Sequence, residues 1–120
     1  MNRFDLEERL IDFSVQIIGL VTNVKNSKAG NHLSGQLIRS GTSVALNYGE
    51  ARSGESKRDF IHKMQIVLKE LRESHICLRI IYKSNLCSNK NQIINIIEEN
   101  NQLIAIFVKS VETAKSKMVN

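Results

Sequence analysis

The feature that most constrains the fold of this chain is the recurrence of apolar side chains at alternating intervals of four and three residues. This spacing places the side chains on one face of an α-helix, where other helices can bury them. The first row is Leu6, Leu10, Phe13, Ile17, Leu20 and Val24. A second row is Phe60, Met64, Val67, Leu71, Ser74, Leu78 and Ile81. A third row is Ile93, Ile97, Asn100, Ile104, Phe107, Val111, Ala114 and Met118, in which Asn100 is an amide that can set helix register at a cost in stability.

The segments between these rows are rich in turn and capping residues, and the chain contains no proline. Long helices with short connections suit such a composition, since helix interiors exclude proline. Ser56, with Asp59 three residues later, resembles a helix-starting capping box. We predict helices over about residues 4–25, 31–51, 56–83 and 90–118. Because short connections force neighbouring helices to run antiparallel, residues 1–120 are predicted to form one all-α domain, an antiparallel up-and-down four-helix bundle.

The compartment is suggested by what the sequence lacks. No stretch approaches the roughly 18 to 20 consecutive apolar residues that a membrane span requires. Cys77 and Cys87 are the only cysteines, they form no CxxC pair, and the first residues do not resemble a secretory signal. We therefore expect a soluble, cytoplasmic protein whose thiols stay reduced.

The segment 31–51 departs from the apolar pattern. Its apolar residues run beside a polar row, Gln36, Ser40, Ser43 and Asn47, which itself follows the 4-3-4 spacing. Such a row is either buried in a hydrogen-bonded network inside the bundle or presented to a partner. Three glycines on the same segment each cost a helix roughly 1 kcal/mol relative to alanine, so close helix approach is the expected compensation at Gly35, Gly41 and Gly49.

No constellation of residues indicates an enzyme or a metal site. A di-metal carboxylate bundle needs Glu on two helices and a Glu-x-x-His pair on each of the other two, and only Asp59 with His62 comes near such a pair. Neither cysteine has an evident base beside it, and the six glycines are too scattered to form a phosphate-binding loop. We therefore expect no catalytic residues, no cofactor and no metal.

A family resemblance is carried by the segment 36–51 and by the block 69–74. The first contains Gln36, Arg39, Ser43, Asn47 and Glu50 in the pattern Q-x-x-R-x-x-x-S-x-x-x-N-x-x-E, and the second reads Lys69-Glu70-Leu71-Arg72-Glu73-Ser74. Together they resemble the 23S rRNA intervening sequence proteins, also labelled S23 ribosomal proteins, over nearly the whole chain. The chain departs from the family at Ala51, where glycine is common, and at Tyr48-Gly49, where Ile-Ala is usual.

The resemblance implies an antiparallel four-helix bundle that assembles into a homopentameric ring without known enzyme activity. It also implies that the motif residues, together with Glu70 and Glu73, serve a polar network or a subunit interface. Members are encoded within intervening sequences of bacterial 23S rRNA genes or elsewhere in bacterial genomes. A related branch, the accessory variability determinant of diversity-generating retroelements, binds nucleic acid and a reverse transcriptase.

Positive charge is concentrated in the middle of the chain. Residues 52–90 carry nine Lys or Arg against four acids, out of a net charge of +5 for the whole chain. The candidate nucleic-acid-binding residues are Arg52, Lys57, Arg58, Lys63, Lys69, Arg72, Arg79 and Lys83. In a monomer they would be an ordinary solvated face, but repetition around an oligomer would multiply weak phosphate contacts. We expect an RNA- or DNA-binding homo-oligomer, with a scaffold that holds a protein partner as the alternative.

Overall fold

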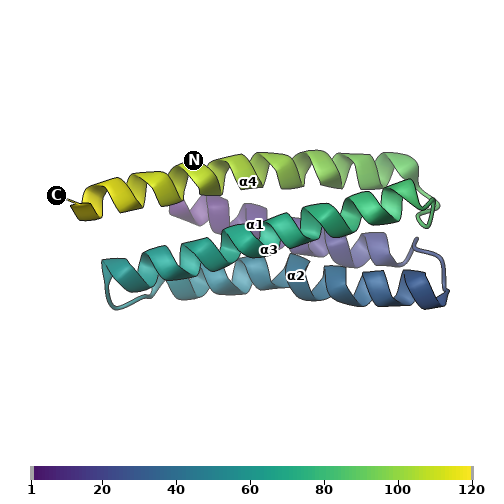
Figure 1. Ribbon diagram of the computed structural model, residues 1–120, viewed down its shortest axis with the longest axis horizontal. Coiled ribbons are helices and arrows are strands. Elements are labelled where there is room, and N and C mark those ends of the chain that lie inside the picture. The colour runs from purple at the N-terminus through teal and green to yellow at the C-terminus, as the bar shows by residue number, and fades with distance from the viewer. Residues whose placement is uncertain (1, 120) are drawn as a thin grey trace.

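Four α-helices lie side by side with alternating directions (Figure 1). The computed structural model describes residues 2–119, without the side chains of Arg3, Phe4 and Val119. The helices are α1 (Arg3–Val21), α2 (Lys28–Arg52), α3 (Lys57–Lys83) and α4 (Lys90–Val119). Each helix packs against the next, and α1 also contacts α4, which closes the bundle. The principal extents are 50 × 22 × 21 Å. The prediction of an antiparallel up-and-down four-helix bundle is confirmed.

The first connection differs from the prediction. The first helix ends at Val21 rather than near residue 25, and the second begins at Lys28 rather than near residue 31. The reason is a contact with the connection between α3 and α4, formed by one isolated bridge between Val24 and Cys87. Here the backbone N–H of Lys25 donates to the carbonyl of Leu86 at 2.7 Å. These backbone groups are bonded across the bundle end, so they cannot extend α1.

Helix termini are fixed by polar side chains. Ser27 accepts a hydrogen bond from the N–H of Gly30 at 3.0 Å, which starts α2 three residues earlier than expected. Ser56 accepts from the N–H of Asp59 at 3.1 Å, as the predicted cap requires. Asn85 ends α3 with φ of 56°, a left-handed conformation that asparagine tolerates.

The core consists of the predicted rows of α1 and α3 together with apolar residues of the other two helices. On α1, the side chains of Leu10, Phe13, Ile17 and Leu20 are fully buried. The ring of Tyr48 on α2 packs edge to face against the ring of Phe107 on α4, with ring centroids 5.7 Å apart. Among the described residues, the interior is therefore filled mainly by aliphatic side chains, together with Phe13 and the Tyr48–Phe107 pair.

The buried face of α4 is rotated from the predicted row. Ile96 and Leu103 are buried, whereas Ile97 and Ile104 are only half-buried. Because α4 packs between α3 and α1, its buried face is centred between two neighbouring apolar rows. The prediction for Met118 was wrong, since its side chain is 43% exposed near the end of the helix.

One of the three glycines in α2 permits a close helix contact. A Cβ atom at Gly41 would lie 3.0 Å from Cγ1 of Ile17, so α1 and α2 approach closely there. The buried hydroxyl of Ser14 donates to the carbonyl of Gly41 at 2.9 Å and joins the same two helices. The expectation of close approach is confirmed at Gly41 and is wrong at Gly35 and Gly49, where an added Cβ would meet nothing within 4 Å.

Asn100 is fully buried in the bundle, and neither atom of its side-chain amide has a hydrogen-bond partner among the described residues. A buried amide without a partner costs about 1–3 kcal/mol. We therefore expect Asn100→Leu, which keeps a similar side-chain size, to raise the free energy of unfolding by about 1–3 kcal/mol. Urea unfolding followed by circular dichroism measures this change. Destabilisation by more than about 1 kcal/mol would show that the amide has a stabilising partner.

Candidate nucleic-acid interface

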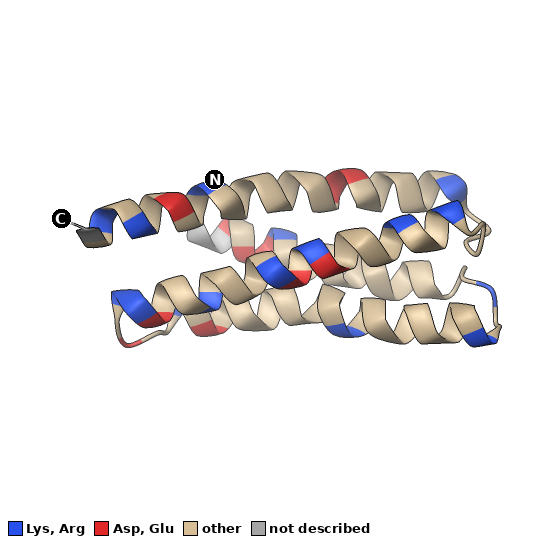
Figure 2. Ribbon diagram, in the orientation of Figure 1, with Lys and Arg blue, Asp and Glu red and all other residues tan. Residues whose placement is uncertain are grey.

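Six basic side chains lie on the solvent-exposed side of α3. They are Lys57, Arg58, Lys69, Arg72, Arg79 and Lys83. We call these six residues the α3 basic face. With 3.6 residues per turn, they fall within an arc of roughly 120° opposite the buried row, and at 1.5 Å per residue they extend over roughly 40 Å. Figure 2 shows the basic positions distributed from one end of α3 to the other.

The charges of this face are available for an external partner. Within residues 2–119, none of the six residues forms an ion pair with an Asp or Glu side chain. Lys69 does lie near Glu73, whose pKa it helps to lower, but no ion pair joins the two. These six side chains therefore add net positive charge to this side of α3.

Two of the predicted nucleic-acid-binding residues instead form ion pairs between helices of the bundle. Arg52, at the end of α2, forms an ion pair with Glu7 of α1 at 3.1 Å. Lys63, on the α2-facing side of α3, pairs with Glu50 at 3.3 Å. Both side chains join neighbouring helices, so the structure does not place them on the α3 basic face.

The motif residue Arg39 links α2 to α3. Its guanidinium donates to Glu70 at 3.1 Å and to Glu73 at 2.8 Å. Burial raises the pKa of Glu70, and the neighbouring Glu73 carboxylate raises it further. The hydrogen bond from Arg39 lowers the pKa of Glu73. One arginine therefore holds two adjacent carboxylates of the 69–74 block together.

The polar row of α2 is divided between the interior and the surface. Ser40 is buried, and it accepts a hydrogen bond from the hydroxyl of Ser74 on α3 at 2.9 Å. Ser43 and Asn47 are half-buried and donate to backbone carbonyls of their own helix. Gln36 is exposed. The bundle thus contains a small serine network, while the outer end of the row faces solvent.

Lys115 of α4 extends the positive region. It lines a shallow groove between α3 and α4 together with Lys69 and Arg72. Lys115 was not among the residues predicted from the sequence to bind nucleic acid. Its position four residues after the buried Val111 indicates the edge of α4 that faces α3.

Other reactive side chains are not assembled into a site. Burial lowers the pKa of His75, and the positive charge of Arg79 lowers it further. Burial also raises the pKa of the Cys77 thiol, which disfavours the nucleophilic thiolate. Across residues 2–119, no group of three or more His, Cys, Asp or Glu residues is placed to hold a metal ion. The helices described also include none with the length and apolar character needed to cross a membrane.

Comparison with known proteins gives the family. A family model described as 23S rRNA-intervening sequence protein matches residues 3–109. The chain belongs to this family. The match includes α1, α2 and α3 and most of α4, and with them both motif segments. The resemblance seen in the sequence is confirmed.

A solved structure of a relative supports the same assignment. It is the crystal structure of a protein with unknown function from the S23 ribosomal protein family of Bacteroides thetaiotaomicron VPI-5482. The two chains are 26% identical and superpose with a TM-score of 0.83, over 93% of this chain and 99% of the relative. No curated protein matches the sequence. This member of the 23S rRNA-intervening sequence family therefore shares its bundle fold with a relative of the S23 ribosomal protein family.

Proposed function

We propose that this 23S rRNA-intervening sequence family protein is a non-enzymatic homo-oligomer that binds RNA or DNA through the α3 basic face. The observation that carries the proposal is a set of six exposed Lys and Arg side chains along one helix that form no ion pair within residues 2–119. Phosphate groups attract such side chains whatever the base sequence, and binding releases condensed counterions. The expected activity is therefore sequence-tolerant binding to the nucleic-acid backbone.

Self-association is supported by apolar side chains on the outside of the bundle. On α1, Ile11, Val15 and Ile18 are 40%, 61% and 51% exposed and follow a 4-3 spacing. Leu46 on the neighbouring α2 is 70% exposed. Exposed large apolar side chains on two neighbouring helices are typical of surfaces that make protein contacts. We propose that copies associate, as a pentamer if the family resemblance extends to stoichiometry, and that association repeats the α3 basic face around the assembly.

The absence of enzyme activity is part of this proposal. Its support is the chemistry of the reactive groups. Cys77 is buried with a raised pKa, its thiol donates to the carbonyl of Leu33, and no base in the described part of the chain is hydrogen-bonded to it. A nucleophilic cysteine needs the opposite environment.

A salt series tests the proposed binding. We expect the purified protein to bind a mixed-sequence duplex at low salt, with an association constant that falls steeply as salt rises. If three to six phosphates are contacted, the slope of log K against log salt is roughly −3 to −5. Filter binding between roughly 50 and 300 mM salt measures this slope. The absence of measurable binding at low salt would contradict the proposal.

A further inference from the structure

One corner of the bundle is left open because α1 is shorter than α3 and α4. It has 19 residues, against 27 in α3 and 30 in α4. At 1.5 Å per residue, α1 is roughly 16 Å shorter than α4. Figure 1 shows the C-terminal end of α4 extending past the start of α1, beside the beginning of α3. Along this last part of α4, no helix among residues 2–119 fills the position that a longer α1 would occupy.

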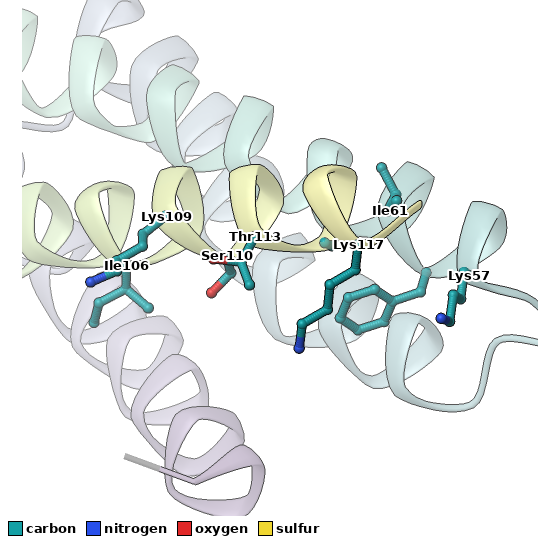
Figure 3. A pocket seen from close by; sticks show the side chains of 9 residues that line it. Lys57, Ile61, Ile106, Lys109, Ser110, Thr113 and Lys117 are labelled. Carbon is teal, nitrogen blue, oxygen red and sulfur yellow. The ribbon is translucent and has the colours of Figure 1, made fainter. Parts of the chain in front are cut away.

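The open corner is an apolar groove of about 570 Å³ between the start of α3 and the end of α4. Phe60 and Ile61 of α3 and Ile106 and Ala114 of α4 supply its apolar lining. In Figure 3, Ile106 and Lys109 lie at one end and Lys57 at the other. We call this site the α3–α4 groove. Its lining is continuous with the core, so an apolar occupant would extend the interior of the bundle.

The rim of the α3–α4 groove is basic. Lys57, Lys109 and Lys117 line it, and in the described part of the chain none of the three forms an ion pair. An apolar lining favours an occupant with an apolar stripe, and three unpaired lysines favour carboxylates beside that stripe. A phosphate backbone satisfies the second requirement but leaves the apolar lining uncovered.

We propose that the α3–α4 groove binds an acidic amphipathic helix of a partner protein. The helix lies in line with α1, places apolar residues at positions i, i+3 or i+4, and i+7 against Phe60, Ile106 and Ala114, and directs Asp or Glu toward the lysine rim. A length of roughly 16 Å corresponds to about three helical turns, or roughly 11 residues. This inference does not require nucleic-acid binding, and the family match ends at Lys109, before Ala114 and Lys117.

Two designed peptides test the proposal. Each has 15 residues, a length chosen to be about one turn longer than the groove. Both carry leucine at i, i+3 and i+7 on an alanine-based helix, and they differ only in having Glu or Lys at the flanking positions. Binding is measured by fluorescence anisotropy with each peptide labelled at its end. We expect the Glu peptide to bind the protein at least tenfold more tightly than the Lys peptide.

Matched variants place the binding on the groove. Ala114→Glu puts a negative charge into the lining and should weaken binding of the Glu peptide at least tenfold. Ala105→Glu, the same change at an exposed position of α4 outside the lining, should leave the affinity within about twofold. Lys109→Glu should reduce the preference for the Glu peptide, while Lys90→Glu at the other end of α4 should not. Unchanged circular dichroism melting of each variant shows that all four remain folded.

Several outcomes overturn the proposal. Equal affinity for the two peptides would remove the role of the lysine rim, and full binding to the Ala114→Glu protein would place the peptide elsewhere. If Ala114→Glu instead changes the oligomer mass in native mass spectrometry while neither peptide binds, the occupant is a second copy of this chain. If the same change abolishes duplex binding and neither peptide binds, the groove belongs to the nucleic-acid interface.

Discussion

Replacing Leu71 with alanine is expected to lower the free energy of unfolding by about 2–5 kcal/mol, the range for emptying a well-packed leucine site. Leu71 is fully buried near the middle of α3. Because α3 packs against both α2 and α4, the lost methyl groups leave a cavity that several helices line and that the backbone cannot close. Equilibrium unfolding in guanidinium chloride measures the change.

The matched control is Ile76→Ala on the same helix, where the side chain is 57% exposed. This variant should change the free energy of unfolding by no more than about 0.5 kcal/mol, since it creates no cavity. A loss of less than about 1 kcal/mol for Leu71→Ala would contradict the packing described for the core. Equal losses for the two variants would contradict it as well.

The fold could be predicted because the determining signal is local. Apolar spacing indicates which side of a helix is buried, as in the rows from Leu6 to Leu20 and from Met64 to Ile81. Both rows are buried in the structure. On α4, adjacent apolar positions such as Ile96 and Ile97 form two overlapping rows. The packing of α4 between α1 and α3 centres its buried face between these rows, which the sequence of α4 alone does not show.

Features that depend on contacts distant in sequence were not predictable. The end of α1 is set by hydrogen bonds to the connection around residues 86–88. The sequence does not show that Arg52 and Lys63 are paired. The folded chain brings Glu7 to Arg52 and Glu50 to Lys63, and each forms an ion pair. The six residues of the α3 basic face follow from helical periodicity alone, because they lie on one helix opposite its own buried row.

The α3–α4 groove was also not predicted from the sequence. The predicted helix lengths already made the first helix shorter than the last. However, the groove depends on which ends of the two helices coincide, and that alignment is fixed by contacts such as the bidentate pair of Arg9 with Glu99. This pair sets the start of α1 beside the middle of α4, so the excess length of α4 extends past one end of α1.

Neutralising three residues of the α3 basic face is expected to have the second large effect. The variant Arg72→Gln, Arg79→Gln, Lys83→Gln removes charge but keeps polar, helix-compatible side chains at exposed positions. It should weaken duplex binding at low salt by roughly 10- to 100-fold and make the salt slope shallower by roughly 3, one for each lost phosphate contact. Thermal stability should be nearly unchanged, since none of the three residues forms an ion pair within residues 2–119.

The matched control removes the same net charge elsewhere. Lys25→Gln, Lys28→Gln, Lys90→Gln also lowers the formal net charge from +5 to +2, at exposed positions near the helix connections. If net charge alone governs binding, the two variants will lose affinity equally. If the α3 basic face governs it, the control will stay within roughly threefold of the unmodified protein.

The most direct measurement is therefore a side-by-side titration of the unmodified protein and these two triple variants with one mixed-sequence duplex at several salt concentrations. The selective loss of affinity and of salt slope in the Arg72, Arg79 and Lys83 variant is the predicted result. Equal affinity of all three proteins, or equal losses in the two variants, would contradict a nucleic-acid interface on α3.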